Sequence, residues 1–438
     1  MVSPRAWRIT GSVHRGERLC WKINSGNRGS LPRLQAAMMK GRFDINDYTK
    51  ETHSYVSISD SLKRCTKIIA AVAATVLLSG CILREFGQTP KDVSSYENLP
   101  YFVDGKFHNP VDTPYYPDRV LGGKPSRLRF FMTSPNAPKV PLPMIRPGKD
   151  AFVEKPEELA VYWLGHATLI IELEGRRFLV DPVFSNAAPI PFAVRRYGPS
   201  PLKRKELPVP DYVLITHDHY DHLEYATIRH FRDEKTLFIV PLGVGAHLVK
   251  WGVAPEKIHE LGFDDELSND GISIIAERAV HFSARTYSTR NHTLWTSYVL
   301  KGKERRVFIS GDTGYSEHFR DIGAKYGPFD MAFFEIDAWN PGWPKTHLFP
   351  NEVIQAYHDV KAKSLIPVHW GVFDLALHPW DESIRMLAAL ADKDGGVNLL
   401  TPLMGQKLVP GITSVSRWWE NLPFSRDGEA TDPNLTKE

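Results

Sequence analysis

Cysteine is scarce in this chain, and neither charge nor hydrophobicity is gathered into long runs. Three of the 438 residues are cysteines, too few for a disulfide-rich scaffold. The formal net charge is +3, and Lys203-Arg204-Lys205 is too short a basic run to follow a nucleic-acid backbone, so we expect no nucleic-acid partner. Hydrophobic residues make up 42% and charged residues 24% of the chain, as in an ordinary globular protein.

A signal-like segment stands out near the N-terminus. Lys63, Arg64 and Lys67 precede or begin an uncharged run, Ile68–Ser79. This run is shorter than the roughly 20 apolar residues of a membrane-spanning helix, but its length and basic flank are typical of a secretory signal. A plain signal peptide or a short anchor would carry the same pattern.

The end of this run, Leu78-Ser79-Gly80-Cys81, resembles the cleavage site of bacterial lipoproteins. The resemblance implies that the chain is cut before Cys81 and that this cysteine is lipidated. It also implies that Ile82, in place of an aspartate, favours the outer membrane, with the protein facing the periplasm. A lipidated Cys81 would be the only cysteine left, so the mature chain would form no internal disulfide and no zinc thiolate.

The remaining chain divides into four expected regions. Residues 1–80 form a leader and signal, in which Met38 and Met39 offer later start sites than Met1. Residues 81–150 are rich in Pro, Tyr and Asn without helical periodicity, which predicts an extended belt. Its aromatic side chains should pack on a hydrolase domain of residues 151–412 (Tyr101, Phe102, Tyr115, Tyr116). Residues 413–438 are expected to form a frayed tail.

From residue 159 the pattern predicts an α/β domain in which strands alternate with helices. Short apolar runs bounded by Gly, Pro and Asp predict strands at 160–163, 169–173, 177–180, 212–215, 237–240, 272–280, 298–300 and 307–309. Amphipathic stretches predict helices at 223–231, 244–249, 350–361 and 380–390. No internal repeat is visible.

A cluster of metal-ligand side chains follows one of these strands. His217, His219, Asp221 and His222 lie within six positions after the apolar run 212–215. Imidazoles and a carboxylate are the ligands that zinc prefers. Since adjacent Asp221 and His222 cannot easily share the metal that His217 and His219 hold, the cluster predicts two metals side by side.

Three further candidate ligands also follow apolar strands. His281 comes after 272–280, Asp312 after 307–309, and His369 after Leu365-Ile-Pro-Val368. A single histidine after a strand is usually structural. Four coincidences of this kind, one of them a dense cluster, predict a metal centre at one edge of the sheets.

These residues resemble the motif set of the metallo-β-lactamase superfamily, over roughly residues 150–410. The resemblance implies an αββα sandwich and two zinc ions with a bridging hydroxide as nucleophile. It assigns His217, His219 and His281 to one zinc and Asp221, His222 and His369 to the other. Asp312 would bridge the ions and set their separation, and Asp221 could take up the proton of the hydroxide.

A closer resemblance is to phospholipase D enzymes that hydrolyse N-acylphosphatidylethanolamine, and to their bacterial relatives. It is carried by Trp163-Leu-Gly-His-Ala-Thr168, Phe178-Leu-Val-Asp-Pro-Val-Phe184, Gly311-Asp-Thr-Gly-Tyr315, His369-Trp-Gly-Val-Phe373 and the belt phrase 101–110. It implies cleavage of a glycerophospholipid phosphodiester, with His347 near the metals contacting substrate or leaving group. The segments 185–196 and 338–345 do not match the lipid groove of the mammalian enzymes.

Several other residues carry weaker expectations. Asp181 and His166 could support the ligands, with a turn cap and a buried structural histidine as their alternatives. Arg285 could bind a substrate phosphate or lie exposed in a loop, and His378 could belong to the site. Apolar residues near the motifs could line an acyl pocket or simply form core (Phe184, 189–192, Trp339, Trp343, Trp370, Phe373).

Two other functions stay open at this level. The same di-zinc site could open a lactone, a β-lactam or another acyl substrate, because the ligand set serves either bond. The fold could also be used without catalysis, as a partner-binding lipoprotein of the envelope. The substrate and the oligomeric state are not determined by these patterns.

Overall fold

Two β-sheets face each other in the computed structural model, which describes residues 66–67, 80, 82–121, 131–156, 158–190 and 192–423. Every element named below belongs to the unit Ala73–Glu438. Cys81 and most of the expected leader lie outside the described residues. Within the described part, no helix is long and apolar enough to cross a membrane.

The first sheet has seven strands in the order β15-β3-β4-β5-β6-β7-β8. Strands β3, β4 and β5 pair antiparallel, and β5, β6, β7 and β8 pair parallel. Their bounds are β3 Ala160–Trp163, β4 Leu169–Leu173, β5 Arg176–Val180, β6 Tyr212–Leu214, β7 Leu237–Pro241, β8 Ile258–Leu261 and β15 Lys407–Leu408.

The second sheet has six strands in the order β14-β13-β12-β11-β10-β9. Strands β12, β13 and β14 are parallel, and β9 to β12 pair antiparallel. Their bounds are β9 Glu266–Asn269, β10 Ile272–Glu277, β11 Ser297–Lys301, β12 Arg306–Ile309, β13 Met331–Glu335 and β14 Leu365–Val368.

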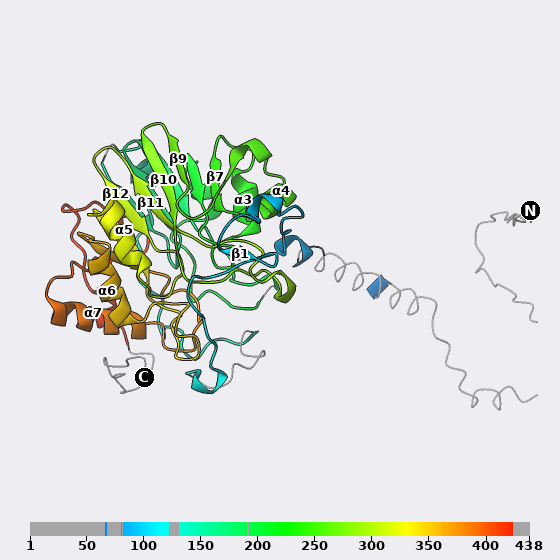
Figure 1. The fold of residues 1–438 in the computed structure, drawn as a ribbon. Coiled ribbons are helices and arrows are strands. Elements are labelled where there is room, and N and C mark those ends of the chain that lie inside the picture. Colours follow the sequence, from blue (N-terminus) through cyan, green and yellow to red (C-terminus); the bar gives the residue numbers. More distant parts are fainter. Residues whose placement is uncertain are drawn as a thin grey trace, which may run out of the picture. The chain divides into compact units, whose positions relative to one another are not determined.

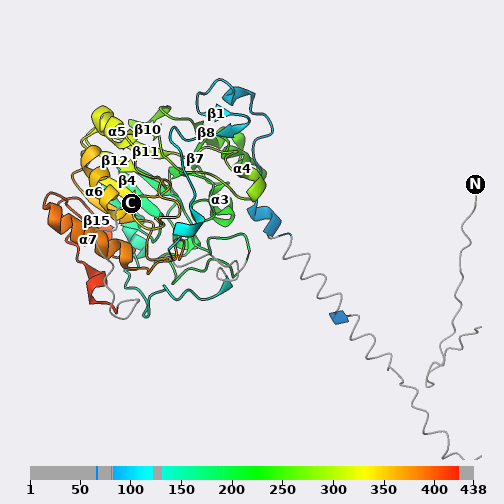
Figure 2. The same cartoon turned by 60° about the horizontal axis from the view of Figure 1, so that its bottom comes forward.

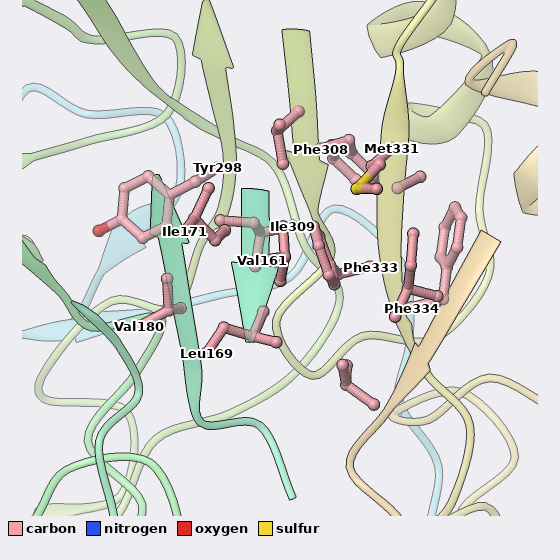
Figure 3. Packing of buried hydrophobic residues seen from close by; sticks show 14 of the residues in the cluster. Val161, Leu169, Ile171, Val180, Tyr298, Phe308, Ile309, Met331, Phe333 and Phe334 are labelled. Atoms are coloured by element: carbon pink, nitrogen blue, oxygen red, sulfur yellow. The ribbon is translucent and has the colours of Figure 1, made fainter. Parts of the chain in front are cut away.

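The main core fills the space between the two sheets. Figure 3 shows Val161, Leu169, Ile171 and Val180 of the first sheet lying opposite side chains of the second, such as Tyr298 and Ile309. Successive strand residues point to opposite faces, so Val161 and Trp163 enter this core while Tyr162 packs in a second cluster on the outer face. Because the first sheet is buried on both faces, its strands read as nearly continuous apolar runs.

Helices cover the outer faces of both sheets. The second cluster packs β3–β7 against α3 Tyr225–Phe231 and α4 Gly245–Lys250, whereas α5 His318–Tyr326, α6 Pro350–Asp359 and α7 Glu382–Asp394 pack on the other sheet. Figures 1 and 2 show these two sets of helices on opposite sides of the sheets. The layers are helix, sheet, sheet, helix, which confirms the predicted αββα sandwich.

The elements missed from the sequence have weak or misleading patterns. Strand β13 is buried at all five positions, so it shows no alternation of apolar and polar residues. Strands β8 and β9 are largely polar and partly exposed, and α5 was not expected at all. Such short segments take their conformation from the neighbours they pair with or pack on.

The described part of the belt is anchored by an aromatic cluster. Strands β1 Phe102–Val103 and β2 Lys106–Phe107 form a hairpin, and Phe102 and Phe107 pack with Phe263 and Trp295 of the main domain. Tyr101 is half-buried and its hydroxyl accepts a hydrogen bond from the backbone N–H of Phe263.

The expectation that Tyr115 and Tyr116 also pack inward is wrong. Their side chains are 58% and 39% exposed, because this stretch runs over the surface beside Trp343 instead of entering the aromatic cluster. At the other end of the chain, Trp418 and Trp419 are buried in the main core. Residues 413–423 therefore pack on the domain, and residues 424–438 lie outside the described part.

Replacing Phe107 by alanine should destabilise the protein by about 3–5 kcal/mol, because a fully buried ring would be lost from the belt cluster. Denaturant unfolding measures this change. Val103→Ala in the same hairpin is the control; Val103 is 50% exposed, so its loss should cost less than about 0.5 kcal/mol. Equal effects of the two substitutions would mean that the belt is not held by this cluster.

Candidate metal centre

Side chains from both sheets meet beyond the carboxyl ends of their strands. Since β10 and β12 are each antiparallel to β11, β10 points the same way as the parallel strands β12, β13 and β14. The same reasoning aligns β3 with β5 and β6. The residues that follow these strands include all seven predicted ligands and two supporting residues (His166, Asp181, His217, His219, Asp221, His222, His281, Asp312, His369).

The first candidate group consists of His217, His219, His281 and Asp312, whose ligand atoms all lie within 4.8 Å of one another. His219 Nδ1 is 2.8 Å from His217 Nε2 and 3.3 Å from His281 Nε2. Three imidazole nitrogens therefore converge on one point, and they belong to the three histidines that the resemblance assigns to one metal.

The second candidate group consists of His166, Asp221, His222 and His369, also within 4.8 Å. Asp221 Oδ2 lies 3.0 Å from His166 Nε2 and 3.4 Å from the Nε2 atoms of both His222 and His369. The predicted ligands of the second metal thus come together. His166, which the sequence analysis did not count as a ligand, adds a nitrogen to this group.

Asp312 reaches both groups. Its Oδ2 is 3.2 Å from His369 Nε2 and 3.7 Å from His281 Nε2, while its Oδ1 is 3.3 Å from His222 Nε2. Oδ1 is buried and makes no hydrogen bond to any residue that the structure describes. A buried carboxylate oxygen that has only the nitrogen of His222 near it and accepts no hydrogen bond is costly, so this position fits a ligand shared by two cations.

Strained backbone aims several of these side chains. His166, Asp181 and His369 have φ values of 54°, 39° and 68°, a region that side-chain-bearing residues rarely adopt. Gly311, just before Asp312, has φ 58°, and a Cβ there would lie 2.9 Å from the carbonyl oxygen of Thr296. Such strain persists where surrounding structure imposes it, often at functional sites.

Oxygen atoms behind the imidazoles fix their orientation. Asp181 Oδ2 is 2.8 Å from His222 Nδ1, and its carboxylate also accepts hydrogen bonds from the backbone N–H and hydroxyl of Thr216. The carbonyl of Thr346 lies 2.9 Å from His281 Nδ1. A metal-bound histidine usually donates its second N–H in this way, so the expected supporting position of Asp181 is the one observed.

The belt also holds a predicted ligand. Asn109 donates from Nδ2 to the carbonyl of His281 at 2.7 Å and accepts from the backbone N–H of His281 at 3.1 Å. The indole N–H of Trp295 donates to the same Asn109 oxygen. One belt side chain therefore clamps the backbone of a candidate ligand 172 residues further along the chain.

Arg285 is buried, so the expectation of an exposed loop residue is wrong, and its contacts give it a structural role in place of the suggested phosphate contact. Its side chain is buried, and Nη1 donates to the carbonyls of Asp218 and Leu223. Nε donates to the carbonyl of Glu85 in the belt. The guanidinium is therefore used to fix the loop that carries His217 to His222.

A buried acid inside the motif reinforces that loop. Asp218 Oδ2 accepts from the hydroxyl of Thr293 and lies 3.2 Å from His247 Nε2. His247 Nδ1 in turn accepts the backbone N–H of Gln88, a belt residue. This buried polar network joins the motif loop, helix α4 and the belt. It therefore gives the site structural support.

His347 lies beside both groups. Its ring centroid is 5.0 Å from that of His281 and 5.8 Å from that of His369. Nδ1 is 3.2 Å from Oε1 of the buried Glu335 at the end of β13, which also accepts the backbone N–H of Leu348. His378, by contrast, stacks on Trp339 and belongs to neither group.

Three of the apolar residues suspected of lining an acyl pocket form core instead. Trp339, Trp370 and Phe373 are buried, and Trp370 stacks on Trp163 and Trp418. Phe373 contacts the ring of His166. Phe192 is 66% exposed, so it is free for contacts at the surface.

Burial and neighbouring charges shift the pKa values of the candidate ligands in opposite directions. Burial and the neighbouring His222 hold the pKa of His217 well below its usual value, and burial lowers the pKa of His166 to about 3. Burial alone would lower the pKa of His222 and His369, but the carboxylates led by Asp312 outweigh it, raising the pKa of His369 to about 10. Without metal, the protons on His222 and His369 balance the negative charge of the carboxylates. Bound cations would take the place of these protons.

Some residues of the centre were not found from the sequence. Asp218 sits inside the motif itself, so a signal existed for it, whereas His166 was expected near the ligands but not as a member of a metal group. Asn109, His247 and Glu335 have no local pattern that separates them from ordinary polar residues. Only the fold brings them to the ligands.

Comparison with known proteins gives one matching family model and several similar proteins. Residues 176–370 match the family model described as beta-lactamase superfamily domain. An uncharacterised protein of Mycobacterium tuberculosis is 40% identical over 370 residues, which cover 80% of this chain and 98% of that protein.

Two further relatives have names that state an activity or a location. N-acyl-phosphatidylethanolamine-hydrolyzing phospholipase D 1 of Caenorhabditis elegans is 34% identical over 249 residues, covering 52% of this chain and 70% of that enzyme. Outer membrane protein RomA of Klebsiella pneumoniae is 36% identical over 104 residues, covering 24% of this chain and 78% of that protein.

Replacing Asn109 by alanine should weaken metal binding at the first candidate group by about 10-fold, because the backbone of His281 loses its clamp. Competition titration with a chromophoric chelator measures the affinity of each of the two sites. Tyr101→Phe is the control, since it removes a belt hydrogen bond to Phe263 without touching a candidate ligand. The same loss of affinity in both variants would show that the belt acts only through general stability.

Proposed function

This chain belongs to the metallo-β-lactamase superfamily of metal-dependent hydrolases, and we propose that it is a di-zinc phosphodiesterase of phospholipase D type. The substrates would be glycerophospholipids like N-acylphosphatidylethanolamine, cleaved between the phosphate and the head-group alcohol. The observation that carries the proposal is the pair of candidate groups joined by Asp312. The relative from Caenorhabditis elegans supports the choice of bond and substrate.

The donor set fits zinc. The two groups together offer six imidazole nitrogens and the carboxylates of Asp221 and Asp312, which suit a borderline-soft cation better than calcium or magnesium. His217, His219 and His281 would hold one ion, Asp221, His222 and His369 the other, and Asp312 both. Bound in this way, the ions would activate water for attack and offset the negative charge that develops on the phosphate.

The protein groups would position the reactants and handle protons. Asp221 contacts three imidazoles through one oxygen, so its carboxylate is held in place to receive a proton from the attacking water. His347 is placed by Glu335 at the side of both groups. We assign it to the phosphate or to the leaving alcohol.

We also propose that the protein is attached to the outer membrane through a lipidated Cys81, facing the periplasm. The similarity to RomA, which is named as an outer membrane protein, supports an envelope location. The chain close behind position 81 is held on the domain, because the indole N–H of Trp251 donates to the carbonyl of Arg84 at 2.8 Å. An anchor at Cys81 would therefore keep the metal centre near the lipid surface.

The first test is metal content together with phospholipid hydrolysis, on the soluble protein expressed from Ile82. We expect about two zinc ions per chain and release of phosphatidic acid from N-acylphosphatidylethanolamine. Removal of the ions by a chelator should abolish turnover and added zinc should restore it. Two ions with lactone or β-lactam opening but no phosphatidic acid would favour the acyl-hydrolase alternative, which the family description also permits.

Asp312→Ala should lower kcat by at least about 100-fold, more than the loss of a group that only supports a ligand, and should reduce the bound zinc. Asp392→Ala is the matched control, since Asp392 pairs with Arg417 on the surface away from the centre. If the cellular role survived in the metal-free Asp312→Ala protein, the chain would act as a binding lipoprotein and the proposed hydrolysis would be wrong.

A further inference from the structure

Each candidate metal group is flanked by a phenylalanine that carries an arginine on its ring. At the first group, the ring of Phe282 lies 4.6 Å from that of His219 and 4.7 Å from that of His281. The guanidinium carbon of Arg290 lies 4.2 Å from the centre of the Phe282 ring. The cation is thus separated from the imidazoles by a single aromatic side chain.

The second group has the same arrangement. The ring of Phe373 lies 4.9 Å from that of His166, and the guanidinium carbon of Arg196 lies 5.3 Å from the Phe373 ring. Arg196 donates to the carbonyls of Gly198 and Val183, which set its orientation. A cation–π contact holds each guanidinium group beside the centre, and the backbone bonds add to it for Arg196 alone.

Neither arginine has a carboxylate within 4.0 Å among the residues that the structure describes. Arg177 and Arg204, in contrast, pair with Glu172 at 2.7 Å and Glu224 at 2.8 Å. Burial lowers the pKa of Arg196 to about 10, so it remains charged at neutral pH. Its side chain donates hydrogen bonds to carbonyl oxygens, and the charge of Glu224 acts on it from beyond ion-pair distance. A partly buried cation without an anion is a ready binding position for one.

There is also space for a ligand beside Arg196. It lies in the shared wall of two cavities of about 340 Å³ and 290 Å³. The larger cavity is lined mainly by apolar side chains, among them Leu142, Met144, Val372 and Met404. A charge at the edge of an apolar cavity suits a molecule that joins an anionic group to a hydrocarbon part.

We propose that Arg290 and Arg196 are specificity-determining residues that bind anionic groups of the substrate on either side of the metal centre. This inference rests on the proposed phospholipid hydrolysis and narrows its substrate class to phospholipids with net negative charge. A guanidinium binds a phosphate or carboxylate through two parallel N–H donors. It repels an ammonium group, and more strongly where water is excluded.

The pair therefore separates lipids by head group. In phosphatidylethanolamine the ammonium balances the phosphate charge, whereas acylation of that nitrogen removes the positive charge. The lipid then presents only negative charge to Arg290 and Arg196. Phosphatidylglycerol shares this property, and phosphatidylcholine does not.

The test is the binding of soluble short-chain lipids to the full-length, zinc-loaded protein. Isothermal titration would compare dihexanoylphosphatidylglycerol, which is anionic, with dihexanoylphosphatidylcholine, which is zwitterionic. The unaltered protein should prefer the anionic lipid. Arg290→Gln and Arg196→Gln should each reduce the ratio of the two affinities by about 10-fold, the worth of one hydrogen-bonded charge. Arg290→Lys should keep most of the preference, which guards against loss of folding as the cause.

Arg229→Gln is the matched control. Arg229 also lies over an aromatic ring, that of Tyr225 on α3, and its loss changes the net charge equally. An unchanged ratio in the Arg290 and Arg196 variants, or an equal fall in the Arg229 variant, would overturn the inference.

Hydrolysis measured on the same lipids separates the two proposals. A charge preference in binding without release of phosphatidic acid would leave recognition standing and contradict the proposed reaction. Turnover without any preference would leave the reaction standing and contradict the role of Arg290 and Arg196.

Discussion

The rest of the structure depends on the shared carboxylate of Asp312. It lies within 4 Å of imidazoles from both groups, and no other described carboxylate does so. Placing it there requires β12 of one sheet to end beside β6 of the other, with glycine at position 311 to let the backbone pass Thr296. Six imidazoles and two carboxylates in a buried space are stable together only when protons or cations balance their charges. This geometry is therefore typical of a metal-binding protein.

The belt completes the centre from behind. It contributes Asn109 to His281, and backbone atoms of Gln88 and Glu85 to His247 and Arg285, which both support the motif loop. The matched family model begins at residue 176, so it does not include these belt residues. The functional unit is thus larger than the catalytic fold, because the loops at a sheet edge need partners that the two sheets do not supply.

Recognition and chemistry are separated in space by two phenylalanine rings. The candidate ligands contact one another across the centre, while Arg290 and Arg196 lie on the far sides of Phe282 and Phe373 with no carboxylate of the described residues within 4.0 Å. The expected role of Arg285 is corrected for a similar reason: its guanidinium is buried and donates from Nε and Nη1 to backbone carbonyls, so it supports the motif loop. Proximity in sequence to a ligand was a poor guide to which arginine faces outward.

By itself the sequence determined the α/β fold class and placed ligand-type residues after apolar strands, since both depend on local signals; the assignment of each residue to a metal came from the family resemblance. Apolar runs such as 160–163 predict strands, and ligand-type residues placed after them predict a metal centre, because the carboxyl ends of parallel strands meet at one edge. Tertiary structure alone decided that His166 joins the second group, that Asn109 and Glu335 support ligands far away in the chain, that Arg285 is buried and that Tyr115 is exposed. The reason is physical: burial and partner choice are set by which surfaces pack together, and a side chain carries the same chemistry in sequence whether or not a neighbour later covers it.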